Sequence, residues 1–322
     1  MTDSKANPPL TLESIYTARA RLEGVIRATP LHRSRTLSRK LGCDLYLKLE
    51  NWQETGSFKV RGALNKLAGL TPEERARGVV TASAGNHGLG VAWASARLNL
   101  PARIVLPERA SQAKVDALRT YSVDLVQHGE DYDEAEAFAW QLQQQEDLVF
   151  VHAFSDPQII AGQGTVGLEI VEAWPEVATV VVPVGGGGLI SGVALAIKSV
   201  KPGARILGVQ SEASPAMYRA IRAGKPVDTP IADTVADGLA GRFVSELTLN
   251  LTLNYVDDVV LVSEDAIRQA VCMILDEEHM LVEGSAAVGL AALLEGQIPA
   301  EGKCVLVLTG RNLESARLKA ML

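Results

Sequence analysis

Four short segments of the chain carry groups that could bind and activate a small molecule. One is a run of glycines that follows an apolar stretch and precedes Leu189, consisting of Gly185, Gly186, Gly187 and Gly188. Four successive residues without a Cβ let backbone N–H groups converge on an anion. The N-terminus of a following helix would add partial positive charge. The run therefore predicts a phosphate-binding loop, with a flexible loop or a tight strand–helix junction as the alternative.

Lys59 is the candidate nucleophile. It stands beside Phe58 in the run 55–62, with small residues around it. A lysine that forms a Schiff base needs an apolar environment that lowers the pKa of its amine. An ordinary surface lysine beside Arg61 would give the same pattern, so this segment alone does not decide the role of Lys59.

Two further segments place polar side chains where strands are expected to end. In residues 83–88, Ser83 and neighbouring backbone amides could bind a carboxylate at a helix N-terminus. Asn86 could hydrogen-bond a phenolic oxygen and His87 could act as a base, with capping and packing as the alternative for both. Thr309 could place a hydroxyl at the edge of a sheet, or it could cap the final helix.

Three of the four segments lie between a predicted strand and a predicted helix. Short β-branched runs predict strands at 78–82, 102–106, 124–127, 148–151, 179–184, 205–209 and 304–308. Helix-like segments alternate with them at 86–99, 111–119, 131–145, from 156 onward, 189–200, 215–223 and 312–321. This order predicts an α/β fold with open, mostly parallel sheets flanked by helices. Ligands of such sheets bind at the carboxyl ends of the strands.

Composition excludes several classes of protein. The 322 residues suggest about two domains, and 47% apolar with 21% charged residues is close to an average globular protein. A net charge of −7 without a basic run argues against nucleic acid or an anionic membrane as partner. Three distant cysteines show no metal spacing or disulfide framework, so we expect a reducing cytoplasm. Residues 1–9 are polar and lack the apolar stretch of a signal peptide, so we expect a loose tail there.

The glycines also weaken three other interpretations. Residues 177–197 contain no charge and are long enough to span a bilayer, but Pro183 and the glycine run would break a membrane helix. We therefore expect a buried strand, a tight loop and a helix there. The dinucleotide fingerprint G-x-G-x-x-G and the phosphate loop G-x-x-x-x-G-K-[ST] are both missing, so nicotinamide and ATP lose their usual sequence support.

Together the four segments resemble the pyridoxal-phosphate enzymes of the tryptophan-synthase β fold (fold type II), and most closely the serine/threonine dehydratase and serine racemase group. The resemblance extends over residues 11–321 and includes the stretches 132–135, 151–157, 161–165, 236–239 and 283–286. It implies a homodimer of two-domain subunits with the cofactor in the cleft between the domains. The large domain would comprise 1–77 and 152–322, and the small inserted domain 78–151.

The resemblance also implies a role for each segment. Lys59 would form a Schiff base with pyridoxal 5'-phosphate and later take the α-proton of the substrate. Phe58 would flank the pyridine ring, Asn86 would bond its 3′-oxygen and Thr309 would face its nitrogen. The cofactor would also contact Gly185 to Gly188, Leu189 and Glu283. Ser83 would join Lys59 in catalysis, and the substrate would contact Ser83, Ala84, Gly85, Asn86, His87, Gly238 and Arg311.

Three departures from the family patterns refine this expectation. Serine racemases have a proton-carrying serine where this chain has Ala84, so racemisation should be slow or absent. Gln210 and Ala216 occupy positions where many relatives have acidic metal ligands, and we predict no metal site. Arg311 stands in the last-strand motif, where relatives usually have glycine. Arg311 or Arg242 could be structural, or could bind the second carboxylate of 3-hydroxyaspartate.

We therefore predict a pyridoxal-phosphate-dependent ammonia-lyase that converts L-threonine or L-serine to a 2-keto acid and ammonia. A 3-hydroxyaspartate dehydratase, a serine racemase, a β-replacement synthase and a non-catalytic cofactor-binding module are the alternatives. Ala84 argues against the racemase. Val60 argues against the synthases, which usually carry K-D-R where this chain has Lys59-Val60-Arg61. The joint presence of Lys59, Asn86, the glycine run and Thr309 argues against the module.

Overall fold

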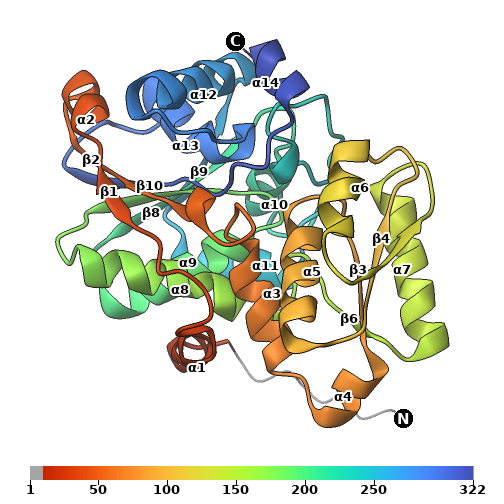
Figure 1. Cartoon of the computed structure of the whole chain (residues 1–322). Helices are drawn as coiled ribbons and strands as arrows, with labels where there is room; N and C mark the ends of the chain where they lie inside the picture. The colour runs from red at the N-terminus through yellow and green to blue at the C-terminus, as the bar shows by residue number, and fades with distance from the viewer. Residues whose placement is uncertain (1–9, 322) are drawn as a thin grey trace.

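The computed structural model describes residues 10–321, and its strands form two separate sheets (Figure 1). The tail expected over residues 1–9 lies outside this range. The six-stranded sheet has the order β1 (Leu31–Arg33), β2 (Asp44–Lys48), β10 (Lys303–Val307), β7 (Thr179–Pro183), β8 (Arg205–Ser211) and β9 (Asp258–Val262). The four-stranded sheet has the order β5 (Asp124–Gln127), β4 (Ala102–Leu106), β3 (Val79–Ala82) and β6 (Val149–Phe150).

Neighbouring strands run parallel throughout both sheets except for the antiparallel pair β1–β2. Helices lie on both sides of each sheet (Figure 1). In the chain they are α1 (Leu12–Leu22), α2 (Arg35–Leu41), α3 (Lys59–Ala68), α4 (Pro72–Arg77), α5 (Asn86–Leu98), α6 (Gln112–Arg119), α7 (Tyr132–Glu146), α8 (Pro157–Ala173), α9 (Gly188–Val200), α10 (Ala216–Ala223), α11 (Glu246–Tyr255), α12 (Glu264–Glu278), α13 (Gly284–Leu294) and α14 (Ser315–Met321). The predicted α/β fold is confirmed.

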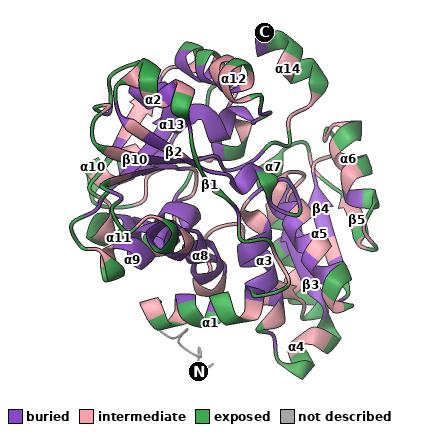
Figure 2. Ribbon diagram, turned by 60° about the vertical axis from the view of Figure 1, so that its left-hand side comes forward, coloured by how far each residue is buried: buried purple, intermediate pink, exposed green. Residues whose placement is uncertain are grey.

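The central strand β7 shows why its sequence is apolar without a break. Val180 and Val182 pack into one core with α8 and α9, whereas Val181 packs into a second core with α12 and α13. Side chains of a strand point alternately to the two faces, and both faces of this sheet are covered. Figure 2 shows β3, β4, α8 and α9 as mostly buried, with exposed residues on α1 and α4.

The stretch 177–197 forms β7, the glycine loop and the start of α9, as predicted. None of the helices in the described residues is long and apolar enough to cross a membrane. The sequence patterns did not indicate β1, β2 or β9, of which β1 is only three residues long. The final helix begins at Ser315 rather than at residue 312.

The four-stranded sheet uses only strands between residues 79 and 150, and the six-stranded sheet uses strands outside that range. The division into domains at residues 78 and 151 stays a prediction. For the site, what matters is where the individual strands end. Strands β2, β3, β7 and β10 all end close to a candidate segment, and the carboxyl ends of parallel strands are where ligands bind.

Candidate active site

Lys59 is the first residue of α3, and backbone hydrogen bonds fix the chain that leads into it. Phe58 N donates to Thr309 O at 3.1 Å, and Ser57 pairs with Gly310 in an isolated β-bridge. The segment before α3 is therefore tied to the segment after β10. This pairing brings together two candidate residues, Lys59 and Thr309, that lie 250 positions apart in the chain.

The Lys59 amine lies in a partly buried position with one protein acceptor. Its Nζ donates to the carbonyl oxygen of Ala153 at 2.9 Å and lies 5.4 Å from the centre of the Phe58 ring. Burial lowers the pKa of Lys59 to about 8, against a smaller opposing effect of the Glu283 charge. A larger share of this amine is thus uncharged near neutral pH than for an exposed lysine, and the uncharged amine is the nucleophile.

The glycine loop joins β7 to α9, and each of its residues is in close contact with neighbouring groups. A Cβ on Gly186 would lie 2.4 Å from the Phe154 ring, and one on Gly188 would lie 3.0 Å from the Phe154 backbone. Gly187 has a φ of +92°, which other residues rarely adopt. Leu189 is the second residue of α9, so the loop presents its backbone amides at the N-terminus of a 13-residue helix.

Asn86 is the first residue of α5, and its amide is held from both ends. Its Nδ2 donates to Glu283 Oε1 at 2.8 Å, and its Oδ1 accepts from Asn312 Nδ2 at 2.7 Å. Asn312 Nδ2 also donates to Thr55 O at 2.8 Å. These bonds fix which end of the Asn86 amide is the donor. In residues 10–321, the second N–H of that amide has no protein acceptor and can serve a ligand.

Glu283 directly precedes α13, and its carboxyl group is buried beside this amide. Burial and the nearby Asp237 raise the pKa of Glu283 to about 8, although the bond from Asn86 opposes the shift. A Cβ on Gly310 would lie 2.5 Å from Glu283 Oε1, and one on Gly238 would lie 2.8 Å from Ser285 Oγ. A side chain at position 310 would therefore displace the Glu283 carboxyl group, and one at position 238 would displace the Ser285 hydroxyl.

Several buried polar atoms here have no hydrogen-bond partner among the described residues: Ser57 Oγ, Thr55 Oγ1, Ser285 Oγ, Thr309 Oγ1 and His87 Nδ1. A buried polar group without a partner costs about 1–3 kcal/mol. Three of these residues lie at contacts described above. Ser57 pairs with Gly310, Ser285 lies next to Gly238, and Thr309 accepts the bond from Phe58 N. Their free hydrogen-bonding capacity marks this region as one that takes a polar ligand.

The two histidines beside Lys59 are neutral. His87 is buried, and its Nε2 donates to Val151 O at 3.0 Å. Burial and the Lys59 charge lower the pKa of His87 to about 3 and that of His152 to about 4. His152 Nδ1 accepts from the backbone amides of Phe154 and Ser155, at 3.2 and 3.0 Å. His152 therefore fixes the backbone of residues 152–155, which includes the carbonyl of Ala153 that accepts from Lys59.

The segment expected at the substrate carboxylate lies between β3 and α5. Ser83, Ala84 and Gly85 are all partly exposed, and Ser83 Oγ accepts from Gly85 N at 3.1 Å. A Cβ on Gly85 would meet no atom within 4 Å, so open space lies in front of this loop. Ala84 offers only a methyl group, which packs against the apolar core between α5, β4 and α6.

The two candidate arginines differ in their surroundings. Arg311 is exposed, and its side chain has no hydrogen-bond or ionic partner in the described part of the chain. Arg242 is already engaged, since it forms ion pairs with Asp228 at 2.8 Å and with Asp133 at 3.2 Å. A carboxylate of a substrate would have to displace these partners to bind Arg242, whereas Arg311 is free to bind one.

At the two positions where the sequence departs from the family's acidic metal ligands, the structure has one buried amide and one methyl group, and Gln210 Nε2 has no hydrogen-bond partner among the described residues. Gln210 is buried, and its Oε1 accepts from Tyr218 N in α10 at 2.8 Å. Ala216 is the first residue of that helix. Among residues 10–321, no group of three or more His, Cys, Asp or Glu side chains is arranged to hold a metal ion.

The comparisons with known proteins agree with this geometry. The family model described as "Pyridoxal-phosphate dependent enzyme" matches residues 22–310. The chain belongs to this family. Members use pyridoxal phosphate, so the predicted cofactor and the predicted family are both confirmed.

Several relatives within the family are similar over nearly the whole chain. An L-threonine ammonia-lyase of Thermotoga maritima is 46% identical over 95% of this chain and 76% of its own length. A catabolic L-threonine dehydratase of Escherichia coli is 40% identical over 96% of this chain and 95% of its own. The solved structure of processed threonine deaminase isoform 2 from Solanum lycopersicum has a TM-score of 0.91 at 37% identity, covering 96% of this chain and 86% of that one. Maize serine racemase also has a TM-score of 0.91, at 34% identity and 96% coverage of both chains.

The residues present fit pyridoxal phosphate. The glycine loop at the N-terminus of α9 can take the phosphate, and the free N–H of Asn86 can take the phenolic oxygen. The unpartnered hydroxyl of Thr309 can take the pyridine nitrogen, and the Lys59 amine can take the aldehyde. These individual roles remain predictions.

The sequence patterns missed three parts of the site. Asn312 contacts Asn86. Its place in the last-strand motif was the sequence signal that could have indicated a role in the site. Phe154 lies in the stretch 151–157 that carried the resemblance, but nothing indicated its contact with the glycine loop. The part played by Ala153 is a backbone carbonyl, which leaves no signal in the side-chain sequence.

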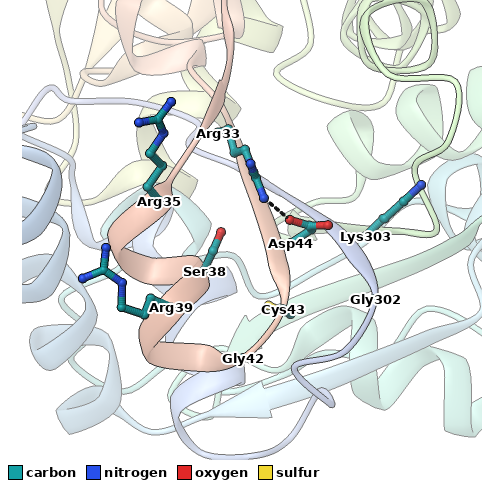
Figure 3. A pocket seen from close by; sticks show the side chains of 9 residues that line it. All are labelled: Arg33, Arg35, Ser38, Arg39, Gly42, Cys43, Asp44, Gly302 and Lys303. Atoms are coloured by element: carbon teal, nitrogen blue, oxygen red, sulfur yellow. Dashed lines mark hydrogen bonds and ion pairs between the residues drawn. The ribbon is translucent and has the colours of Figure 1, made fainter.

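A separate surface groove of about 700 Å³ lies away from this site (Figure 3). Its lining comes from the end of β1, from α2 and from the beginnings of β2 and β10, and comprises Arg33, Arg35, Ser38, Arg39, Gly42, Cys43, Asp44, Gly302 and Lys303. Because β2 and β10 run parallel, their beginnings lie at the opposite edge of the sheet from Thr309. The groove therefore contains none of the predicted site residues.

The pKa of Lys59 predicts how imine formation depends on pH. We expect apoprotein to form the imine with added pyridoxal phosphate at a rate that rises with pH and is half-maximal near pH 8, because only the uncharged amine attacks the aldehyde. The Glu283→Gln variant removes a charge that raises the Lys59 pKa, so its half-maximal pH should be lower. Visible absorbance of the imine measures both. A half-maximal pH near the ordinary lysine value of 10.5 would contradict the geometry.

Proposed function

We propose that this protein is an ammonia-lyase that eliminates the β-hydroxyl of L-threonine or L-serine, releasing a 2-keto acid and ammonia. The main support is a buried Lys59 amine of lowered pKa in a chain that is 46% identical to an L-threonine ammonia-lyase. In the racemase position the chain carries Ala84, whose methyl group cannot move a proton. This favours elimination over racemisation.

Pyridoxal phosphate supplies an aldehyde that condenses with amines and a ring that withdraws electrons from the carbon bearing the amine. The residues of the chain bind the cofactor and the substrate and move the proton. Lys59 Nζ binds the cofactor and, once released, takes the α-proton of the substrate. The backbone amides of Gly85 and its neighbours at the start of α5 bind the substrate carboxylate.

Asn86 and Thr309 orient the ring. Glu283 and Asn312 hold the Asn86 amide so that a donor faces the phenolic oxygen. Thr309 offers a hydroxyl, which can donate or accept a hydrogen bond but cannot form a salt bridge with a protonated ring nitrogen. The ring is then a weaker electron sink than it would be beside a carboxylate, and a weaker sink favours prompt loss of the β-hydroxyl.

We also propose a cytoplasmic homodimer with a small domain at 78–151 that closes over the substrate. The resemblance to the dehydratase group supports the dimer. Two of the three cysteines, Cys43 and Cys304, are buried as free thiols, which suits a reducing compartment. Light scattering of purified protein measures the oligomeric state directly, and a monomer at working concentration would exclude the dimer.

A second candidate, a 3-hydroxyaspartate dehydratase, is favoured by one observation. The Arg311 guanidinium is exposed and free of partners among the described residues, so it could bind a second substrate carboxylate. Threonine and serine have no group for Arg311 to bind.

The two functions predict different substrates. Purified protein with pyridoxal phosphate should release keto acid and ammonia from L-threonine or L-serine, and Arg311→Met should leave that rate nearly unchanged. Release from 3-hydroxyaspartate alone, lost in Arg311→Met, would replace the proposed function with the second one. Release from none of them would contradict both.

The Ala84→Ser variant tests the direction of the chemistry. Because Ala84 is partly exposed in the segment between β3 and α5, a serine there would add a hydroxyl that can carry a proton, at the cost of one added atom. Elimination should continue at a similar rate, and some D-serine should form from L-serine, as chiral chromatography would detect. Loss of cofactor binding in this variant would show that the loop does not lie on the substrate side.

A further inference from the structure

Two residues after Lys59, an arginine is buried in the protein interior. Arg61 keeps 1% of its surface exposed, and each nitrogen of its guanidinium is bonded. Its Nε and Nη2 donate to the two oxygens of Glu50 at 2.7 and 2.8 Å. Its Nη1 and Nη2 donate to the two oxygens of Glu169 at 2.6 and 2.8 Å, and Nη1 also donates to Thr165 Oγ1 at 3.0 Å. The guanidinium therefore forms two hydrogen bonds with each of two carboxylates.

Lys48 balances the charge of this group. Its Nζ bonds Glu169 and the carbonyl of Thr29, and lies 3.9 Å from Glu50 Oε1. We call Lys48, Glu50, Arg61 and Glu169 the Arg61 cluster. Burial alone would raise the pKa of Glu50, but Arg61 and Lys48 hold that pKa below its usual value, so the carboxylate stays charged. The cluster then contains two positive and two negative groups.

The cluster ties the first turn of α3 to three other elements. Lys48 ends β2, Glu50 begins the short 3-10 turn Glu50–Trp52, and Glu169 lies on α8. Helices α3 and α8 also approach closely, since a Cβ on Gly62 would lie 2.8 Å from Ile159 O. The position of α3 along and around its axis is thereby fixed at its N-terminal end.

Lys59 shares that first turn. Residues of an α-helix advance by about 100° each, so Arg61 and Lys59 point to nearly opposite sides. The Arg61 side chain anchors the turn toward β2 and α8, while the Lys59 amine reaches the Ala153 carbonyl on the other side. A rotation or shift of this turn would move the amine directly.

Stability is a weak explanation for such a cluster. Replacing a buried ion network by apolar side chains of similar size is often neutral or stabilising, because taking charges out of water is costly. Paired arginine–carboxylate contacts, in contrast, define direction and distance sharply, and a lysine cannot reproduce them.

We propose that the Arg61 cluster is a positioning device for Lys59, which holds the amine where it can reach both the cofactor aldehyde and the substrate α-proton. The proposal deepens the proposed function and rests on it for the second of these two tasks. The first task, imine formation, is measured without any substrate. Failure of the proposed function and failure of the positioning role are therefore distinguishable.

The Arg61→Lys variant tests the role while keeping the buried charge. We expect it to fold and to bind pyridoxal phosphate. Imine formation should be slower with an altered pH dependence, and kcat for L-threonine should fall by roughly 100-fold, the cost of about 1 Å of misplacement. KM should change little, because the groups proposed to bind the substrate carboxylate lie in the segment between β3 and α5 and not on α3. Unchanged imine kinetics and kcat would overturn the proposal.

Lys66→Met is the matched control. Lys66 lies in the last turn of the same helix and pairs with Asp156 at 2.8 Å, so the variant also breaks an ion pair that tethers α3. Because this pair is seven residues from Lys59, imine kinetics and kcat should stay near the wild-type values. An equal loss in Lys66→Met would show that any loosening of α3 suffices, and would overturn a specific role for Arg61.

A balanced double variant separates position from stability. Arg61→Met alone leaves Glu50 buried without its main partner and should lower the melting temperature. The double variant Arg61→Met, Glu50→Gln removes one positive and one negative charge and leaves the Lys48–Glu169 pair intact. The melting temperature should recover, while imine formation and kcat should stay low. Recovery of all three together would mean that the cluster serves stability alone, and would overturn the proposal.

Discussion

Burial of the Lys59 amine is the constraint on which the arrangement of the site depends. A buried ammonium is costly, so burial shifts the amine toward its uncharged form, with a pKa of about 8. The ionisable groups around it are biased toward neutrality as well. His87 and His152 have lowered pKa values, and the pKa of Glu283 is raised to about 8. A site of mostly neutral, oriented groups suits a cofactor that brings its own charge in its phosphate.

The fold meets this constraint by joining distant segments through backbone contacts. The bond from Phe58 N to Thr309 O and the bond from Glu283 N to Gly310 O, both 3.1 Å, place three segments side by side. Asn86 then connects them to the helix that follows β3. Each segment lies near the carboxyl end of a parallel strand, so the sheets position the groups and the loops carry the chemistry.

The sequence predicted best what has a local signal. The glycine run, its flanking strand β7 and helix α9 were predicted from residue types alone, because glycine and β-branched residues act on their own neighbourhood. Lys59 was ambiguous without the family resemblance, because an ordinary surface lysine would give the same pattern, and the structure places its amine in a partly buried position. The Asn86–Glu283–Asn312 contacts and the Arg61 cluster join residues up to 226 positions apart, and nothing in one sequence states such pairings.

The central claim is that Lys59 is the residue that holds the cofactor. The most direct measurement is reduction of the purified holoprotein with borohydride, followed by proteolysis and mass spectrometry of the labelled peptide. The account predicts one reduced pyridoxyl group, on Lys59 in the segment that leads into α3. A label on Lys48, Lys66 or any other lysine, with Lys59 unmodified, would contradict it.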